Sequence, residues 1–329
     1  MRTTLLSAAA SVILCGCASS AVRIADQSVR SVPLGYNTIS ALVESRKRAT
    51  NVYLLGFQRN SSASKLFIRF YYRNYDEPEY GTLVVTGDGV RETTGYANVW
   101  YSDEDVPVFR LEGGKQWYEG EGKASRLCSR WDDASYVFEG GASIPYDEIS
   151  GIHGVVGADL VLLHFKTEAR PSQRVHISGT NYVTLAYPGK GAWIVSSPES
   201  PRKPIIKLPK DLEPTTAYAC GDKLFLFDTY RPQGGEFVRR CLLYEKSSSG
   251  YDLAKQLQIP WMGGVLDYWP ETGTALIEAL NDRHLFPTYY RFNVQTKRRS
   301  LIGFVPADDV LFLKDDVIRT LDGALGKGK

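Results

Sequence analysis

The chain is poor in the residues that most often carry catalysis or hold metal ions. Only four of its 329 residues are histidine, and they form no HExxH pattern and no pair at i, i+4 spacing, as a helical metal site requires. The serine-hydrolase pattern GxSxG is also absent, since the nearest segment, GGASIP at 140–145, lacks the closing glycine. We therefore predict no metal ion and no cofactor, and the sequence marks no catalytic residue.

The histidines themselves look structural. They are His153, His164, His176 and His284. His164 falls in an apolar strand-like run and His176 in the strand-like RVHIS, so we expect each to pack in a sheet rather than act as a general base.

Acidic residues are plentiful, with 37 Asp and Glu, but none stands out as half of a catalytic pair. The acidic segment SDEDVP at 102–107 lacks the alternating ligands and the glycine of a calcium loop, so it predicts a solvated turn. The glycine-rich GDGVRETTG at 87–95 does not lead into a helix, whose N-terminus a phosphate cradle needs, so it predicts a hairpin turn.

An excess of either charge is lacking too. The chain has 39 basic and 37 acidic residues, and removing residues 1–16, whose only charged residue is Arg2, leaves 38 − 37 = +1. A nucleic-acid-binding domain normally carries a strong basic patch. We therefore expect no nucleic-acid partner.

Cysteine is scarce beyond the N-terminus, where only Cys128, Cys220 and Cys241 occur. Three cysteines are too few for a disulfide scaffold, and their wide spacing does not match a zinc site. One disulfide is compatible with an oxidising compartment, and the sequence leaves open which cysteines, if any, form it. We expect mostly buried thiols that behave as small apolar residues.

The N-terminus has the pattern of an export signal. Met1-Arg2 precedes the uncharged run Leu5 to Leu14, which is well short of the roughly 20 apolar residues that span a bilayer. The run ends in Leu14-Cys15-Gly16-Cys17, which resembles the lipobox of bacterial lipoproteins: an aliphatic residue, two small residues and a cysteine. The resemblance implies cleavage before Cys17 and attachment of acyl chains to Cys17, which would anchor the protein in a membrane.

The residue after the lipobox bears on the location. Ala18, rather than aspartate, follows Cys17. In the enterobacterial sorting pattern this implies the outer membrane, with the protein facing the periplasm or the cell surface. The alternative is a soluble secreted protein whose signal ends after Ala18 or Ala21.

The rest of the chain reads mainly as short strands. Its 20 Tyr, 13 Phe and 6 Trp suit the half-buried surfaces of β-sheets. One helix is predicted over Asn37 to Arg48, with Ile39, Leu42 and Val43 on one face. From Asn51 onward, apolar runs alternate with Gly- and Ser-rich turns, which predicts an all-β domain.

Two segments in the C-terminal third share one layout. Residues 217–260 and 265–306 each read as four strands, and they end in Ile259-Pro260 and Val305-Pro306; a similar ending, Leu208-Pro209, comes earlier. Four strands repeated every 40 to 50 residues or so are typical of propeller blades. The body therefore resembles a β-propeller of about six to seven four-stranded blades, although no blade motif occurs. The alternatives are a large β-sandwich or two smaller β domains.

This layout divides the chain into four parts. They are a signal peptide at 1–16, a lipid-anchored tether with a short helix at 17–50, a propeller-like domain at 51–322 and a flexible tail at 323–329. Residues 309–321 read as only two strands of a last blade. We expect the N-terminal strands at 51–57 and 65–72 to complete it.

The function predicted from this layout is binding. Loops between the blades of a propeller gather on the face that usually binds, and Trp and Arg are common at interface hot spots. The candidates on that face are Trp261, Arg231, Arg283 and His284; Trp261 has an alternative role as a plug between blades. Tyr268 and Trp269 are expected in the core. We expect a lipid-anchored scaffold or binding module for an envelope protein, a peptide or a glycan; the alternative is an extracytoplasmic hydrolase acting on carbohydrate or peptide.

Overall fold

The described part of the computed structural model covers residues 28–49, 51–74, 77–119, 126–130, 133–166, 174–177, 180–183, 191–209, 212–230, 238–248, 250–259, 264–279, 288–303 and 309–326. Apart from two α-helices and one short 3-10 turn, the elements in these residues are β-strands, which confirms the all-β prediction. The proposed signal peptide, Cys17 and Lys329 lie outside the described residues.

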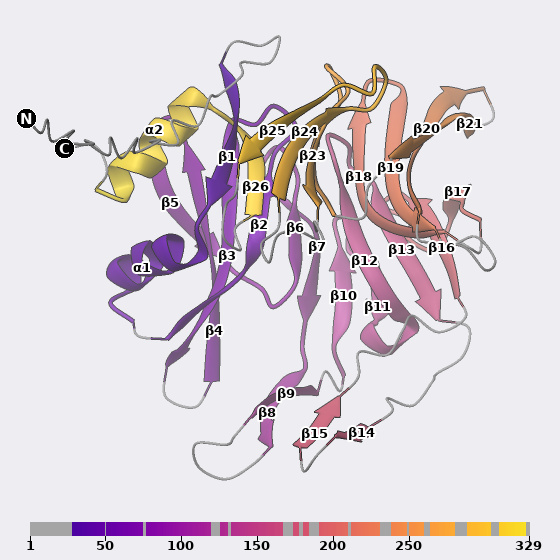
Figure 1. The fold of residues 1–329 in the computed structure, drawn as a ribbon. Coiled ribbons are helices and arrows are strands. Elements are labelled where there is room, and N and C mark those ends of the chain that lie inside the picture. The colour runs from indigo at the N-terminus through magenta and orange to yellow at the C-terminus, as the bar shows by residue number, and fades with distance from the viewer. Residues whose placement is uncertain are drawn as a thin grey trace, which may run out of the picture.

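Most of the strands form five groups of four, and each group is antiparallel (Figure 1). Group 1 contains β2 (Val52–Arg59), β3 (Lys65–Asn74), β4 (Glu77–Thr86) and β5 (Gly89–Thr94). Group 2 contains β6 (Val99–Tyr101), β7 (Pro107–Glu112), β10 (Ser135–Phe138) and β11 (Ser143–Pro145). Group 3 contains β12 (Ile149–Val156), β13 (Val161–Lys166), β16 (Gly191–Ser196) and β17 (Pro204–Lys207).

The last two groups match the two segments whose layout the sequence repeats. Group 4 contains β18 (Glu213–Cys220), β19 (Lys223–Tyr230), β20 (Val238–Ser247) and β21 (Gly250–Ile259). Group 5 contains β22 (Val265–Trp269), β23 (Thr274–Ala279), β24 (Thr288–Asn293) and β25 (Arg299–Gly303). The four-strand reading of both segments is therefore confirmed.

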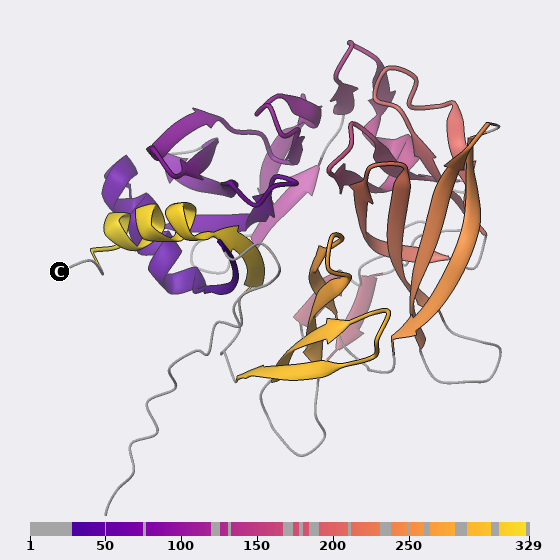
Figure 2. The ribbon, with the colours of Figure 1, turned by 90° about the horizontal axis from the view of Figure 1, so that it is seen from above.

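Groups 3 and 4 share one eight-stranded sheet. Their first strands, β12 and β18, run parallel and pair at Val155 with Ala217 and at Val156 with Tyr218. Seen from above, groups 1 to 5 follow one another around the molecule, and the C-terminal strand returns beside group 1 (Figure 2). The ends of β2, β6 and β12, the first strands of groups 1, 2 and 3, line one pocket.

Two hairpins interrupt the groups in the first half of the chain. β8 (Lys115–Glu119) pairs with β9 (Arg126–Arg130) between β7 and β10, and β14 (Arg174–Ile177) pairs with β15 (Thr180–Val183) between β13 and β16. Both lie at the lower edge in Figure 1. These insertions separate strands of groups 2 and 3 that pair in space, so the four-strand layout is not continuous in this half of the sequence.

The two ends of the described chain meet in a two-stranded sheet. β1 (Val29–Leu34) pairs antiparallel with β26 (Asp309–Lys314). The prediction that residues 51–57 and 65–72 complete the last unit is wrong, because these residues form β2 and β3 of group 1. β1 itself falls within the segment predicted as a tether, so that segment is folded from Val29 onward.

The second strand predicted before residue 321 is also wrong, because Asp315–Ala324 forms helix α2. Asp315 and Asp316 stand in its first turn, where negative charge interacts well with the helix dipole. Val317, Ile318 and Leu321 form its buried face. An apolar spacing of this kind is helical, whereas a strand would alternate its buried residues.

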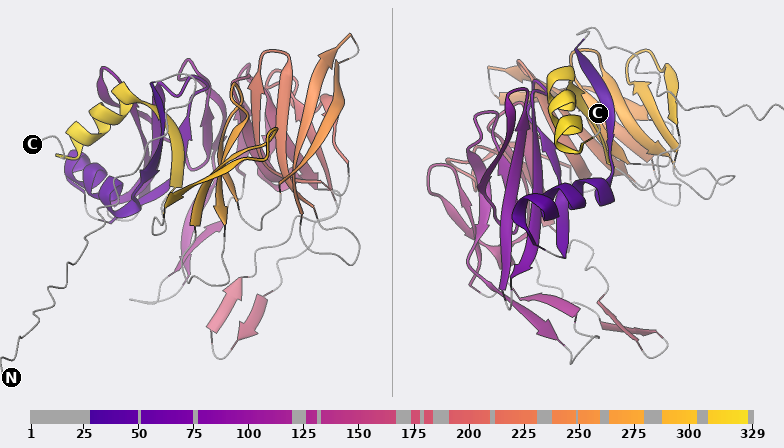
Figure 3. Two further views of the ribbon diagram at one scale, coloured as in Figure 1. Left: turned by 45° about the horizontal axis from the view of Figure 1, so that its top comes forward. Right: turned by 90° about the vertical axis from the view of Figure 1, so that its left-hand side faces the viewer.

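The predicted N-terminal helix is confirmed as α1 (Tyr36–Lys47), with Ile39, Leu42 and Val43 buried as expected. Helices α1 and α2 lie together on one side of the molecule, against group 1 (Figure 3). They share an apolar cluster with β1, β3, β4 and β26. Tyr268 and Trp269 are buried elsewhere in the core, as predicted.

Two of the three body cysteines are described, and both are free thiols. Cys220 is partly buried, and Cys241 is fully buried. Burial raises the pKa of Cys241 to about 12, so its thiol is protonated and behaves as the expected small apolar residue. Cys128 lies in β9, and its side chain is outside the described residues.

Candidate functional site

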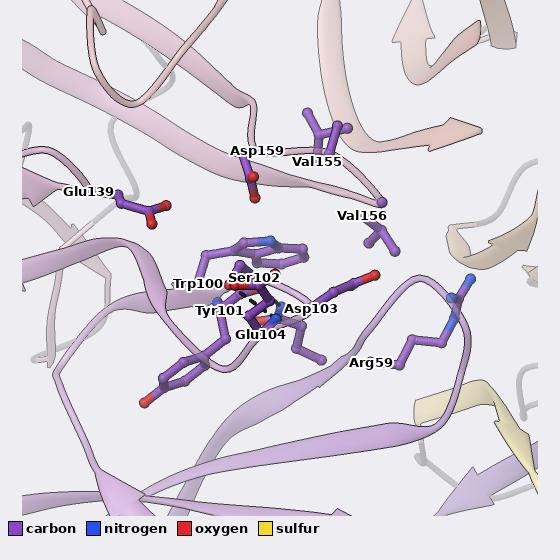
Figure 4. Close-up of a pocket in the computed structure, with 13 residues that line it drawn as sticks. Arg59, Trp100, Tyr101, Ser102, Asp103, Glu104, Glu139, Val155, Val156 and Asp159 are labelled. Atoms are coloured by element: carbon purple, nitrogen blue, oxygen red, sulfur yellow. Dashed lines mark hydrogen bonds between the residues drawn. The ribbon is translucent and has the colours of Figure 1, made fainter. Parts of the chain in front are cut away.

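A pocket of about 230 Å³ lies where the first strands of groups 1, 2 and 3 reach their turns (Figure 4). Its walls come from the end of β2, from β6 with the turn that follows it, from the β10–β11 turn and from the β12–β13 turn. Side chains from four separated parts of the sequence therefore meet in one cavity.

The turn after β6 is tied to group 1. Asp103 accepts hydrogen bonds from the backbone nitrogen of Ser61 at 2.8 Å and from the Ser61 hydroxyl. Asp105 pairs with Lys65 at 2.9 Å and also with Arg91. The turn predicted at residues 102–107 is confirmed, but Asp103 and Asp105 are held by these partners rather than only by water. In the described parts of the chain, no cluster of three or more His, Cys, Asp or Glu side chains could hold a metal ion.

The opposite wall is fixed by glycine. Gly157, in the β12–β13 turn, has a φ of +86°, and a Cβ on it would lie 2.6 Å from the carbonyl oxygen of Ala219. Only glycine tolerates both the conformation and the close approach. The turn that carries Asp159 is therefore pressed against the end of β18.

Trp100 provides the aromatic surface of the pocket. Its indole packs directly on Gly154 of β12, where a Cβ would collide with the ring. In Figure 4 the ring lies between Asp159 and the turn that carries Asp103 and Glu104. Because Trp100 is only partly buried, one part of the ring faces the cavity.

The lining is strongly acidic. Its described residues include the carboxylates of Asp103, Glu104, Glu139 and Asp159, and Arg59 is the one basic residue among them. Glu104, Glu139 and Asp159 are exposed, and their side chains make no hydrogen bond or ion pair with other described residues. The pocket therefore presents negative charge to solvent.

Arg59 does not offset this charge, because it is already paired. Its side chain and that of Asp267 are each 2% exposed, and the Arg59 Nε donates to the Asp267 carboxylate at 2.7 Å. Burial alone would lower the pKa of Arg59, but the charge of Asp267 outweighs it and the pKa is raised. Nη2 of Arg59 also donates to the Tyr268 carbonyl at 2.7 Å, and the guanidinium lies over the rings of Tyr218 and Trp269.

The same ion pair joins distant parts of the fold. The Asp267 carboxylate also accepts hydrogen bonds from the backbone nitrogens of Tyr268 at 2.7 Å and Phe312 at 2.8 Å. Arg59 belongs to group 1, Asp267 to group 5 and Phe312 to β26. We call Arg59 and Asp267 the closing pair, because they connect the first group to the last strands.

Among the described lining residues, no serine, cysteine or lysine nucleophile stands beside a histidine base. None of the described lining residues is a histidine, cysteine or lysine. The Ser102 hydroxyl accepts hydrogen bonds from the backbone nitrogens of Glu104 and Val106. His153 and His164 lie outside the pocket, and burial lowers the pKa of both. His164 hydrogen-bonds Ser150 and packs on Trp193, which fits the structural role expected for it.

The site residues predicted from the sequence cannot be compared with this pocket. Cys17, Arg231, Trp261, Arg283 and His284 all lie outside the described residues. The described strands that adjoin the segments containing Arg231, Trp261, Arg283 and His284 end on the side of the sheets away from the pocket. The acidic turn at residues 102–107 was the sequence signal closest to the pocket, but on its own it predicted only a solvated turn.

Comparison with protein-family models and with curated proteins finds no match for this chain. Within the described ranges, neither helix is long and apolar enough to cross a membrane.

Proposed function

We propose that the chain is a lipid-anchored binding module of a bacterial cell envelope, with the pocket beside Trp100 as a binding site. The lipobox-like Leu14-Cys15-Gly16-Cys17 supports the anchor. The observation that carries the binding role is the pocket itself: it combines an aromatic surface with the carboxylates of Glu104, Glu139 and Asp159, which have no partner among the described residues. Such a lining favours a positively charged group, because cations interact with both carboxylates and indole faces.

We further propose that the body is a β-propeller. Five antiparallel groups of four strands, with a closing sheet formed by β1 and β26, support this architecture. In it, the groups are five blades and the two-stranded sheet takes the place of a sixth. The closing pair of Arg59 and Asp267 then lies where the ring closes.

The partner class follows from the charge of the pocket. A basic peptide segment or the basic surface of an envelope protein matches the unpaired carboxylates. A glycan fits if it carries amino groups, since neutral sugars gain little from negative charge. We therefore favour a basic protein or peptide partner over a neutral glycan.

The test is crosslinking in intact cells, followed by purification of the tagged protein and mass spectrometry. We expect a reproducible envelope partner that is lost in the Glu139→Gln/Asp159→Asn double variant. Glu213→Gln is the matched control, because Glu213 is exposed and lies in β18 at the end away from the pocket. A partner that is retained equally by the double variant would contradict this site.

The membrane anchor has a separate test. We expect Cys17→Ser to abolish incorporation of labelled fatty acid and to release the protein from the membrane fraction, whereas Cys15→Ser keeps both. Labelling that persists in Cys17→Ser would show that the lipobox reading is wrong.

A second function is favoured by one observation, the four carboxylates around one cavity. Glycoside hydrolases use two carboxylates roughly 5–10 Å apart across a sugar. Turnover of envelope oligosaccharides that is lost in Asp159→Asn or Glu139→Gln would establish the hydrolase. Partner capture without turnover would favour the binding module.

A further inference from the structure

A second arginine of group 1 is only partly buried and has an environment unlike that of Arg59. Arg69 lies in β3, directly opposite Gly56 of β2, where the two strands share a bulge. Gly56 has a φ of +134°, and a Cβ on it would lie 3.0 Å from Nη2 of Arg69. Because Gly56 has no side chain, the guanidinium extends across β2 instead of stopping at it.

The guanidinium of Arg69 is largely unsatisfied. It has five N–H donors, but only Nη1 donates to a described acceptor, the Val99 carbonyl at 3.0 Å. Nε is buried without a hydrogen-bond partner. Among the described residues, no carboxylate lies within ion-pair distance of Arg69.

The charges around Arg69 are few. Burial lowers its pKa, and the electrostatic effects of Tyr101, Tyr36 and Asp309 only partly oppose this. The hydroxyl of Tyr36 donates to the Asp309 carboxylate at 3.4 Å, so Asp309 has a partner of its own. An isolated charge that is removed from water is costly unless a counter-charge or hydrogen bonds reach it.

His153 lies within electrostatic reach of this guanidinium. Val99, which accepts the hydrogen bond from Arg69, is followed by Trp100, and Trp100 packs on Gly154 beside His153. Burial, together with the charge of Arg69, lowers the pKa of His153. The imidazole stacks on Trp193 at 6.0 Å and makes no hydrogen bond with the described residues.

We propose that Arg69 anchors a second binding site, for a small oxyanion such as a carboxylate or phosphate group, in the space beside Gly56. Nε and Nη2 lie on one edge of the guanidinium, and neither has a hydrogen-bond partner among the described residues. Paired donors of this kind suit both oxyanions. Apart from the chain neighbours of Gly56, only Nη2 and the central guanidinium carbon of Arg69 lie within 4 Å of where a Cβ on Gly56 would stand, which leaves room beside the guanidinium. Arg69 as a residue is partly exposed. This site is separate from the acidic pocket, which repels anions, and does not depend on the function proposed there.

The test is calorimetric titration of the full chain in detergent with inorganic phosphate and, separately, with acetate, at constant ionic strength. We expect saturable binding of at least one of them, weakened at least tenfold in Arg69→Met. Arg202→Met is the matched control, because Arg202 is an arginine whose side chain is 55% exposed in an ion pair with Glu148. Arg202→Met should bind as the unmodified protein does. Phosphate binding without acetate binding would assign a phosphate group, and the reverse a carboxylate.

A second measurement needs no change at Arg69. The imidazole resonances of His153, assigned by their loss in His153→Gln, should titrate at higher pH when the site is saturated. A bound anion offsets the charge of Arg69, which is the charged group that lowers the pKa of His153. Absence of saturable binding, equal binding by folded Arg69→Met, or an unchanged His153 titration at saturation would each overturn the proposal and leave water as the partner of Arg69.

Discussion

Two arginines on neighbouring strands of group 1, Arg59 buried and Arg69 partly buried, show how differently this fold uses the same side chain. Arg59, at the end of β2, is fully paired with Asp267 and packed between Tyr218 and Trp269. Arg69, on β3, has one hydrogen bond, a buried Nε without a partner and no carboxylate beside it in the described structure. Burial alone therefore does not indicate a structural role. The presence or absence of a counter-charge separates the closing pair from the proposed anion site.

The largest expected effect comes from breaking the closing pair. Asp267→Ala leaves Arg59 buried without a counter-charge and removes the acceptor of the Phe312 nitrogen. We expect a loss of about 3–5 kcal/mol in the free energy of unfolding, measured by denaturant titration. Asp252→Ala, an exposed aspartate of β21, should change it by less than about 0.5 kcal/mol. If Asp267→Ala lowered the free energy of unfolding as little as Asp252→Ala does, the closing pair would not be what holds group 1 to the last strands.

A smaller effect is expected from Gly157, which brings the β12–β13 turn against β18. Gly157→Ala forces a Cβ towards the Ala219 carbonyl and strains a positive φ, which should cost about 1–3 kcal/mol. Gly221→Ala is the matched control, since Gly221 also has a positive φ but nothing lies within 4 Å of its Cβ position. Thermal unfolding should rank Gly157→Ala below Gly221→Ala. Equal melting temperatures for the two variants would show that the positive φ, and not the close approach to Ala219, determines the cost.

The contribution of Arg69 to stability can be compared with that of the closing pair. Arg69→Met removes a partly buried charge that has no ion-pair partner among the described residues and keeps an apolar side chain of similar length. In chloride buffer we expect the free energy of unfolding to change by less than about 1 kcal/mol, because the lost hydrogen bond and the avoided cost of burying the charge oppose each other. A loss comparable to that of Asp267→Ala would make Arg69 a structural residue like Arg59.

The smallest expected effect is a pH dependence from the buried histidines. The pKa values of His153 and His164 are lowered from 6.5 in the folded state, so below that value the unfolded chain binds more protons. Their contribution to stability is complete above about pH 6.5 and is lost as the pH falls towards the lowered folded values. The slope of stability against pH between 6.5 and 5 should decrease in His153→Gln. An unchanged slope in both His153→Gln and His164→Gln would contradict burial of neutral imidazoles.

The sequence predicted the fold best where contacts are local. Groups 4 and 5 were read correctly because tight turns such as Gly221-Asp222 join strands that follow each other directly. The two inserted hairpins hid groups 2 and 3, since they separate strands that pair in space. The pairing of β1 with β26 joins opposite ends of the chain, and no local pattern encodes it. The last segment was predicted wrongly because strand β26 passes directly into helix α2, with no turn residues between them to mark the boundary.

The sites were less accessible to sequence reasoning. Arg59 and Asp267 lie 208 residues apart, and neither belongs to a motif. The carboxylates of the acidic pocket come from three different turns. Whether a buried arginine is paired depends on where the neighbouring strands place their carboxylates. That is a property of the assembled sheets, so Arg59 and Arg69 are indistinguishable in the sequence.

The contrast between the two arginines is tested most directly by a crystal of the protein soaked in selenate, a tetrahedral oxyanion whose selenium scatters anomalously. We predict an anomalous peak within hydrogen-bond distance of Nε or Nη2 of Arg69, and no peak at Arg59. The same crystal form of Arg69→Met should lack the peak. No peak at Arg69 in the unmodified protein, or a peak that persists in Arg69→Met, would contradict the assignment of Arg69 as the free arginine that binds an anion.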